Sequence, residues 1–295
     1  MNDLAAFVAA ALARELPTPV RVAAERLAAE RGGVAVLFYG SVLRTGALGD
    51  ILDFYVLTDR PPSGRARLWP DVSYHELPVD GQTMRAKVAT MPLGAFAQMA
   101  RGERRDTTIW TRFCQPAALA WAARPTAEAN TVAAVTEAAI TAARVAALHG
   151  PAEGTAGAYW SALFRATYAT ELRVEAPGRE AEIVARSPDY FAALLPLAWQ
   201  AGAVTFTADA ERLSPFLTPA QQRALTRAWQ RARRAGKALN VARLVKAAFT
   251  FEGAGAYGLY KVARHTGVDL PLTPWRARHP ILAAPAVLWR VWRAR

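Results

Sequence analysis

A glycine–serine turn between two short β-type runs constrains the fold of this chain more than any other feature. The first run, at 34–39, is aliphatic and aromatic and ends directly in Gly40 and Ser41. After a loop, a second run begins near Ile51 and carries Asp53. Short apolar runs bounded by turn residues are typical of buried strands. The sequence therefore predicts a strand, a Gly-Ser turn, a loop and an acidic strand.

The remaining pattern predicts an α+β fold with a mixed sheet. Strands are expected at 34–39, 51–59, 72–77, 84–90 and 117–122. Beyond about residue 125 the pattern is mostly helical, with helices expected at 126–149, 155–172, 188–202, 218–235 and 239–248 and a small hairpin within 172–186. We divide the chain into three parts, at 1–124, 125–250 and 251–295. The second part is expected to be mostly helical and winged-helix-like.

The residue types exclude several classes of protein. A single cysteine, Cys114, cannot form an internal disulfide, and the four histidines lack the spacing of a zinc site. The N-terminus has an apolar run without a basic start, which does not match a signal peptide. No uninterrupted apolar stretch approaches the roughly 18 residues that span a bilayer. These observations predict a cytoplasmic protein that is soluble or attached to a surface.

The net charge of +12 lies almost wholly near the C-terminal end of the chain. Residues 231–295 hold ten arginines and three lysines against two acidic residues. Within them, a short helix from Pro285 is expected to place Leu288, Val291 and Trp292 on one face, as in interfacial membrane anchors. The charge therefore predicts an anionic membrane surface as the partner, on the inner face of the cytoplasmic membrane. Tryptophans that cluster with aliphatic residues make nucleic acid the less favoured partner.

The strand–turn–strand unit resembles the polymerase-β-type nucleotidyltransferases. In that superfamily the glycine lets the backbone approach a triphosphate, the serine binds phosphate oxygens, and a carboxylate on the next strand holds Mg²⁺. The superfamily usually has two acids spaced as Asp-x-Asp, whereas Ile51 takes the first place here. A second metal ligand is therefore left open between Asp50, three residues before Asp53, and an acid from elsewhere in the chain.

Within this superfamily the chain resembles the mitochondrial translocator assembly and maintenance proteins, which are phosphatidate cytidylyltransferases (CDP-diacylglycerol synthases). The family also lacks the first of the two usual acids. The similar segments follow in the same order over about residues 36–265: Tyr39-Gly40-Ser41, Leu52-Asp53-Phe54, 109–116 around Arg112, 167–173 around Glu171 and Arg173, and 246–250 from Lys246. Glu171 stands where the family has an aspartate.

This resemblance implies Mg²⁺-dependent transfer of CMP from CTP to phosphatidic acid, giving CDP-diacylglycerol and pyrophosphate. Residues 1–124 would be the nucleotidyltransferase domain, 125–250 a helical second domain, and 251–295 a basic amphipathic tail on the membrane. The implied catalytic residues are Asp53, Glu171 and Arg112. The residues assigned to CTP and its phosphates are Tyr39, Gly40, Ser41, Lys87, Arg173 and Lys246. Mg²⁺ is assigned to Asp53, with Glu171 or its rival Asp50 as the second ligand.

Two other functions fit the same motifs. A nucleotidyltransferase that modifies RNA or protein would share the Gly-Ser turn and Asp53, and its basic tail would bind RNA. A catalytically inactive binding protein with the nucleotidyltransferase fold would have lost the first metal-binding acid. That protein would show no Mg²⁺-dependent binding of CTP.

Overall fold

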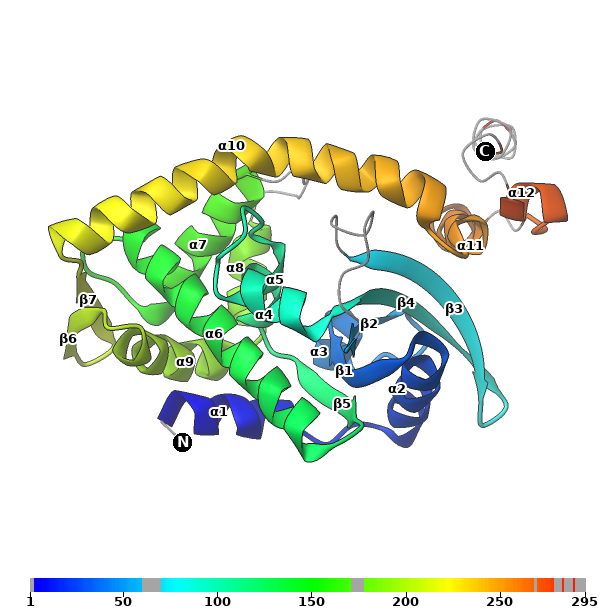
Figure 1. Cartoon of the computed structure of the whole chain (residues 1–295), viewed down its shortest axis with the longest axis horizontal. Coiled ribbons are helices and arrows are strands. Elements are labelled where there is room, and N and C mark those ends of the chain that lie inside the picture. Colours follow the sequence, from blue (N-terminus) through cyan, green and yellow to red (C-terminus); the bar gives the residue numbers. More distant parts are fainter. Residues whose placement is uncertain are drawn as a thin grey trace.

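A twisted sheet forms one half of the molecule and a group of helices forms the other (Figure 1). The structure is a computed structural model that describes residues 3–59, 70–170, 178–267 and 270–278, together with Ala283 and Trp289. The strands are β1 (Gly33–Tyr39), β2 (Leu52–Thr58), β3 (Asp71–Val79), β4 (Gln82–Pro92) and β5 (Ala118–Ala122). They lie in the order β3-β4-β2-β1-β5, with β2 parallel to β4 and the other neighbours antiparallel. The predicted α+β class and the mixed sheet are confirmed.

The two faces of the sheet are buried against different helices. Successive side chains of a strand point to opposite faces. One set, which includes Phe38 and Phe54, packs against α2 (Thr18–Arg31). The other set, which includes Leu37 and Tyr55, belongs to a larger core shared with the helical half. Asp53 and Lys87 lie on this second face, and the candidate site is there.

The larger core is completed by helices from both halves of the chain. They are α1 (Asp3–Leu12), α4 (Leu93–Ala100), α5 (Thr108–Phe113), α6 (Pro125–His149), α7 (Ala156–Thr170), α8 (Arg179–Ala185), α9 (Pro188–Ala201) and, through Trp229, α10 (Pro219–Thr250). The short helix α3 (Ser41–Thr45) packs Val42 into the smaller core, and α11 (Ala254–Thr266) and α12 (Pro274–Arg278) follow α10. A hairpin, β6 (Thr205–Asp209) and β7 (Arg212–Phe216), joins α9 to α10. The larger core therefore continues across residue 125 without a break.

The prediction of a hairpin within 172–186 is wrong for the described residues of that segment, 178–186. Gly178, with φ of 90°, precedes the helix α8 instead of forming a strand turn. Glu180 and Glu182 occupy the first turn of α8, where negative side chains interact favourably with the helix dipole. The hairpin of this region is β6–β7, further along the chain.

Helix α6 lies at the centre of the helical half (Figure 1). Among the described residues it is the helix that is long and apolar enough to cross a membrane, judged by length and composition alone. Most of its apolar window, 61%, is buried inside the molecule, against α1, α4, α5, α7 and α9. This burial is what the central helix of a folded core requires.

Helix α10 is a single helix of 32 residues, where the sequence predicts two helices at 218–235 and 239–248. The gap between the two predicted helices is 236–238. In the structure Gly236 is helical, and a Cβ there would lie 2.6 Å from the backbone oxygen of Thr170. Glycine at 236 thus permits a close approach of α10 to the end of α7, at a modest cost in helix propensity. The helix crosses the upper edge of the molecule from the hairpin to α11 (Figure 1).

Phe191 tests the larger core, because its ring is fully buried against Trp160 and Phe164. Phe191→Ala is expected to lower the free energy of unfolding by about 4 kcal/mol, through lost burial and the cavity left behind. The matched control is Phe216→Ala, since Phe216 is 57% exposed, and should cost no more than about 1 kcal/mol. Urea unfolding measures both values. Equal losses from the two variants would contradict this description of the core.

Candidate functional site

The predicted Gly-Ser turn and Asp53 are in contact. Tyr39, the last residue of β1, pairs with Asp53 on β2, and Gly40 follows with φ of 93°. A Cβ on Gly40 would lie 2.6 Å from Oδ2 of Asp53. Both the backbone angle and this close approach require glycine at position 40. The carboxylate of Asp53 therefore faces the backbone of the turn, and Ser41 begins the short helix α3 directly beside it.

Asp53 belongs to a row of four side chains that crosses the sheet. In the strand register Tyr39 pairs with Asp53, Asp53 with Lys87, and Lys87 with Tyr74. Residues opposite each other on neighbouring strands have their side chains on the same face. An acid and a lysine are thus held side by side between two tyrosines. The structure brings Asp53 and Lys87 together, as the assignment of both to one site requires.

Arg112 reaches the same row from helix α5. Its guanidinium lies over the ring of Tyr39, 5.1 Å from the centroid, and over the ring of Tyr55, 5.8 Å away. Such cation–π contacts hold a guanidinium without neutralising its charge. Burial raises the pKa of the fully buried Tyr55, and the charge of Arg112 opposes that rise. Arg112 is therefore a cation positioned by aromatic rings next to the Gly-Ser turn.

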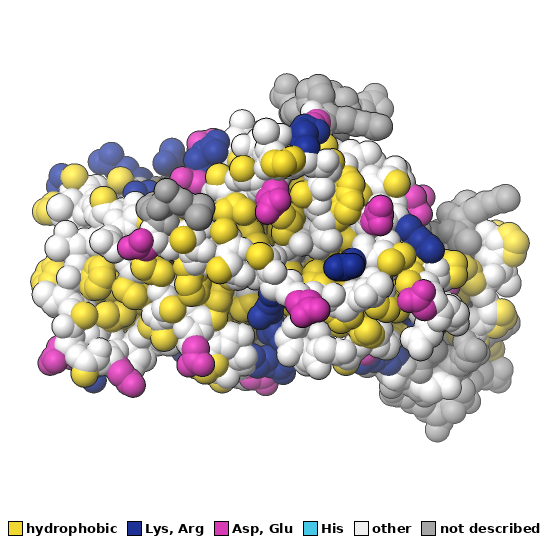
Figure 2. Space-filling model, turned by 90° about the horizontal axis from the view of Figure 1, so that it is seen from below, with side chains coloured by type: hydrophobic (Ala, Val, Ile, Leu, Met, Phe, Trp, Pro, Cys, Tyr) yellow, Lys and Arg dark blue, Asp and Glu magenta, His cyan; other side chains and the backbone are white. Residues whose placement is uncertain are grey.

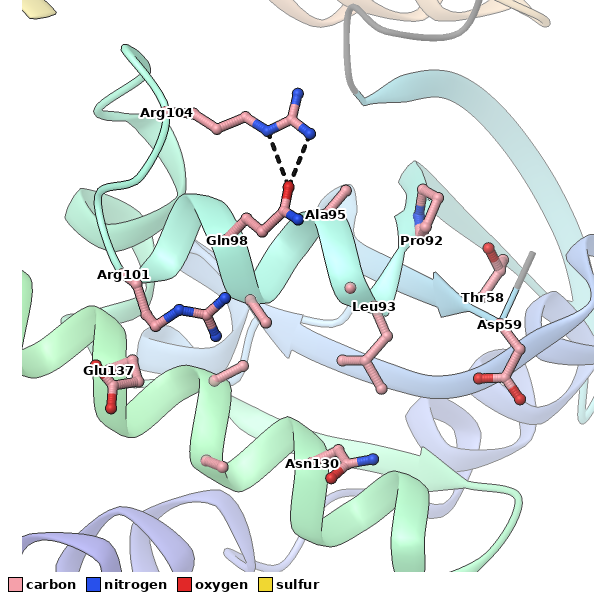
Figure 3. A pocket seen from close by; sticks show the side chains of 14 residues that line it. Thr58, Asp59, Pro92, Leu93, Ala95, Gln98, Arg101, Arg104, Asn130 and Glu137 are labelled. Atoms are coloured by element: carbon pink, nitrogen blue, oxygen red, sulfur yellow. Dashed lines mark hydrogen bonds between the residues drawn. The ribbon is translucent and has the colours of Figure 1, made fainter. Parts of the chain in front are cut away.

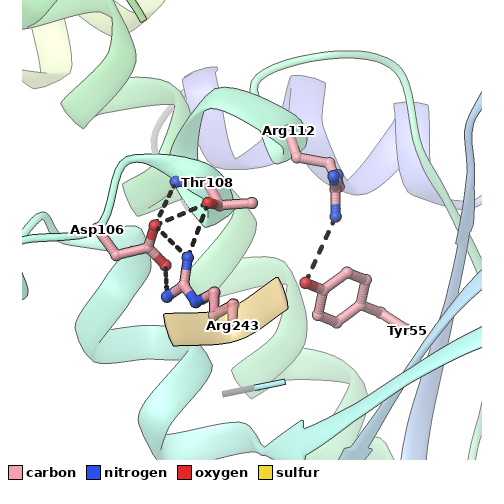
Figure 4. A network of polar contacts seen from close by, with 5 residues as sticks. All are labelled: Tyr55, Asp106, Thr108, Arg112 and Arg243. Atoms are coloured by element: carbon pink, nitrogen blue, oxygen red, sulfur yellow. Dashed lines mark hydrogen bonds and ion pairs between the residues drawn. The ribbon is translucent and has the colours of Figure 1, made fainter. Parts of the chain in front are cut away.

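A buried ion pair anchors the start of α5 to the long helix α10 (Figure 4). Two nitrogens of Arg243 bind the two oxygens of Asp106, at 3.0 and 2.6 Å. The backbone N–H and the hydroxyl of Thr108 donate to the same carboxylate, at 3.0 and 2.7 Å. Burial alone would raise the pKa of Asp106, but the bonds from Arg243 and Thr108 outweigh it and lower that pKa. This four-bond cluster fixes the helix that carries Arg112.

Helix α11 covers the open side of the row. The ring of Tyr257 meets that of Tyr74 at 5.6 Å, and the guanidinium of Arg85 lies 4.7 Å from the centroid of Tyr260. Burial raises the pKa of Tyr257, and the nearby negative charge of Asp53 raises it further. Tyr257 and Tyr260 of α11 therefore cover one side of the site, and we call these two residues with their helix the α11 roof. The cations near the site include Arg85 besides Lys87 and Arg112, which the sequence singled out.

The segment before α11 is bound to the edge of the sheet. Glu252 accepts a hydrogen bond from the backbone of Tyr74 and forms an ion pair with Arg31 at 2.7 Å. Gly253, with φ of 79°, would place a Cβ 2.6 Å from the carbonyl oxygen of Tyr74. The glycines of this segment were the available sequence signal for a close approach. That signal gives no partner, so Tyr257 and Tyr260 were missed.

The other predicted site residues have different surroundings. Asp50, which precedes β2, forms an ion pair with Arg264 of α11 at 2.7 Å. Lys246 of α10 pairs with Asp71 at the start of β3. Glu171 and Arg173 lie outside the described residues, as does most of the segment 281–295. The structure thus gathers Tyr39, Gly40, Ser41, Asp53, Lys87 and Arg112, and it places Asp50 at the edge of the roof.

The groups around Asp53 are compatible with an Mg²⁺ ion whose coordination is completed by phosphate oxygens of the substrate. In the described ranges no three His, Cys, Asp or Glu side chains come together in a way that could hold a metal ion. Mg²⁺ is commonly held by one or two carboxylates together with substrate phosphates, not by a cage of protein ligands. The Asp53 carboxylate, facing a glycine turn that a phosphate can approach, fits that mode.

A separate pocket of about 630 Å³ lies at the far ends of β2 and β4, between α4 and α6 (Figure 3). Its polar groups are largely engaged with protein partners. Arg104 donates to Gln98, and Arg101 binds Glu103 with two nitrogens. None of the residues assigned to the site from the sequence lines this pocket. The row around Asp53 is therefore the candidate site.

Comparison with known proteins adds no relative: no protein-family model matches the chain, and no curated protein is significantly similar to it. The assignment of function therefore depends on the residues and their geometry.

Gly40→Ala tests the contact between the turn and Asp53. The substitution adds backbone strain and a clash with the carboxylate, so it should destabilise the protein by about 3 kcal/mol. Gly46→Ala is the matched control, because Gly46 also has a positive φ, 71°, but nothing within 4 Å of its Cβ position. The control should cost about 1 kcal/mol. Equal thermal unfolding shifts for the two variants would show that position 40 needs no close approach.

Asp106→Asn tests the cluster at α5 through its pH dependence. Because the folded pKa of Asp106 is lowered, its carboxylate stabilises the fold above about pH 4, and this stabilisation is lost as the pH falls through the folded pKa. Asp106→Asn should therefore cost about 3 kcal/mol at pH 7, and progressively less as the pH is lowered below about 4 toward the folded pKa. Asp209→Asn, on an exposed strand end, should change little at either pH. A pH-independent loss at Asp106 would refute the role of its charge.

Proposed function

We propose that the chain is a phosphatidate cytidylyltransferase that transfers CMP from CTP to phosphatidic acid. The observation that carries this proposal is the contact between the Gly40 backbone and the Asp53 carboxylate, with Lys87 and Arg112 on either side. A bare turn lets a triphosphate approach closely, and the two cations neutralise its charge. The resemblance of the Tyr39-Gly40-Ser41 and Leu52-Asp53-Phe54 segments to the translocator assembly and maintenance family selects CTP and a lipid phosphate as reactants.

The proposal includes a polymerase-β-type nucleotidyltransferase fold for the sheet-bearing part. It is supported by the position of the turn at the end of β1 and of Asp53 on the adjacent β2. A winged-helix-like arrangement is proposed for the part after residue 125. It is supported by the β6–β7 hairpin, which is bonded through Leu213 to Gly154 at the start of α7.

The reaction would be an in-line displacement at the α-phosphorus of CTP. An oxygen of the phosphatidic acid phosphate forms a bond to that phosphorus, while the bond to the oxygen bridging the α- and β-phosphorus breaks. The electron pair of the broken bond leaves with pyrophosphate. Because the lipid phosphate is already an anion near neutral pH, no general base is required. Catalysis would then consist of positioning and charge neutralisation around two anions.

Each residue of the row has a defined task in this scheme. Gly40 and Ser41 receive the triphosphate with their backbone and hydroxyl groups. Lys87 supplies a point charge beside Asp53, whereas Arg112 offers a planar guanidinium suited to two phosphate oxygens. The ring of Tyr39 orients that guanidinium. Tyr257 and Tyr260 of α11, which lie beside the row, would limit the access of water to the bound phosphates.

Asp53 would hold Mg²⁺, together with Asp50 or Glu171. Mg²⁺, when bound, would supply positive charge to the triphosphate and to the departing pyrophosphate. Asp50 would have to exchange its ion pair with Arg264 to take part. Arg173 and Lys246 remain proposed phosphate ligands, the latter by exchange of its partner Asp71.

The proposed location is the inner face of the cytoplasmic membrane, where the protein would be peripheral. Phosphatidic acid is a membrane lipid, so the enzyme must meet it at a bilayer surface. Leu272 and Trp275 are 47% and 53% exposed, and Trp289 is 52% exposed. Exposed tryptophan and leucine near a basic C-terminal end are typical of a protein that contacts the membrane interface.

Asp53→Asn tests the proposal. Purified protein is incubated with labelled CTP, Mg²⁺ and phosphatidic acid vesicles, and lipid-linked cytidylate is measured. The variant should remain folded and lose about 1,000-fold or more in turnover, because several kcal/mol of charge stabilisation are removed. Asp209→Asn, with the same change at an exposed position, should keep full activity.

The same assay separates the other candidate functions. Label transferred to added RNA or to protein, with none in lipid, would overturn the proposal in favour of a different nucleotidyltransferase. CTP binding without transfer to lipid, RNA or protein would indicate an inactive binding protein. Retained lipid cytidylylation by Asp53→Asn would refute the metal assignment.

A further inference from the structure

Helix α10 is strongly and one-sidedly basic. Between Pro219 and Thr250 it contains eight arginines and lysines and no acidic residue. Two of the eight are turned to the protein: Arg243 binds the buried Asp106, and Lys246 binds Asp71. The other six have exposed side chains, namely Arg223, Arg227, Arg231, Arg233, Arg234 and Lys237. Among the described residues none of these six forms an ion pair, so their charges are left for an external partner.

Helical spacing aligns most of these cations. At 100° per residue, four of these cations and two valines lie within about 80° of the helix circumference, an arc that also includes Gln230. The four cations and two valines are Arg223, Arg227, Arg234, Lys237, Val241 and Val245, which we call the α10 stripe. The two valines are 47% and 54% exposed. The stripe is therefore cationic for most of its length and apolar near α11.

The stripe differs from the opposite side of the molecule. The face seen from below, away from α10, shows acidic and basic side chains interspersed among apolar ones (Figure 2). Helix α10 forms the upper edge, and α11 and α12 continue from its C-terminal end (Figure 1). Exposed Leu272 and Trp275 lie in this continuation. The cations and the exposed apolar side chains thus follow one another along a single edge.

We propose that the α10 stripe is the surface with which the protein docks on an anionic lipid membrane. A helix of 32 residues is about 48 Å long and offers a line of contact, which suits a plane better than a pocket. Each arginine or lysine close to an anionic leaflet contributes on the order of 1 kcal/mol. The valines can enter the interface beside the headgroups, as the apolar face of an interfacial helix does.

A membrane fits the stripe better than a nucleic acid does. Proteins that bind single-stranded RNA present aromatic side chains on which bases stack, and the stripe has none. Two exposed valines in line with the cations would meet phosphates on a nucleic acid but acyl chains in a bilayer. The choice of a membrane rests on the proposed function, because phosphatidic acid is a lipid. The contact itself is independent of turnover and can be measured without it.

The test is flotation of the full chain with vesicles of phosphatidylcholine alone or mixed with phosphatidylglycerol. The wild type should bind the mixed vesicles and be released as salt is raised. A stripe variant combines Arg223→Gln, Arg227→Gln, Arg234→Gln and Lys237→Gln. It should bind about 100-fold or more weakly, since each lost cation is worth about fivefold. Val241→Ser with Val245→Ser should weaken binding about fivefold, with the salt dependence unchanged.

The matched control removes four exposed arginines from other elements, with Arg14→Gln, Arg21→Gln, Arg26→Gln and Arg186→Gln. It has the same net charge as the stripe variant and should bind within a few-fold of the wild type. Equal losses in the two four-site variants would overturn the proposal, because overall charge would then explain binding. Wild-type-like binding by the stripe variant would also overturn it. Tighter binding of the stripe to an RNA oligonucleotide than to anionic vesicles would replace the membrane with nucleic acid.

A second measurement keeps this inference separate from the proposed function. Cytidylylation of short-chain phosphatidic acid dispersed in detergent should be the same in the wild type and in the stripe variant. If neither protein turns over, the proposed function fails, and vesicle flotation still decides the docking surface. If turnover in detergent falls with the stripe variant while its flotation with vesicles is unchanged, α10 acts on the site and not on the membrane, and the docking proposal is overturned.

Discussion

The close approach of the Gly40 backbone to the Asp53 carboxylate is the constraint on which the candidate site depends. It requires a residue without a Cβ at the end of β1 and an acid at the paired position of β2. The strand register then determines the neighbours, because Lys87 must stand opposite Asp53 on β4. A backbone contact of this kind tolerates little movement. The sheet consequently acts as a rigid base on which phosphate-binding groups and a carboxylate are presented together.

The arginines of the site are oriented by aromatic rings. Arg112 lies over two tyrosine rings, and Arg85 lies over Tyr260, so aromatic faces orient both guanidinium groups. By contrast, Arg243 is bound by the buried carboxylate of Asp106 and serves to anchor an element. The same residue type is thus used in two ways. Tyrosine rings orient Arg112 and Arg85 at the site, and the Asp106 carboxylate binds the arginine that holds two helices together.

Local pattern was sufficient for the sheet, the Gly-Ser turn and Asp53, because each depends on residues close together in sequence. The roof could not be predicted in this way. Tyr257 and Asp53 are far apart along the chain, and only the path of α10 brings them together. Gly236 lies in the gap between the two helices predicted at 218–235 and 239–248, but in the structure it is part of one helix and permits contact with Thr170. Long-range packing decides such cases, and a local pattern does not contain it.

The continuity of α10 has a mechanical consequence. One continuous set of backbone hydrogen bonds links the two ends of α10, at the β6–β7 hairpin and next to α11. The Asp106–Arg243 pair and the close approach at Gly236 hold α10 to the rest of the molecule between these two ends. A small tilt of the end of α10 near the β6–β7 hairpin would therefore displace Tyr257 and Tyr260 relative to Asp53. A contact that shifts α10 would therefore also change the space between the α11 tyrosines and the Asp53 carboxylate.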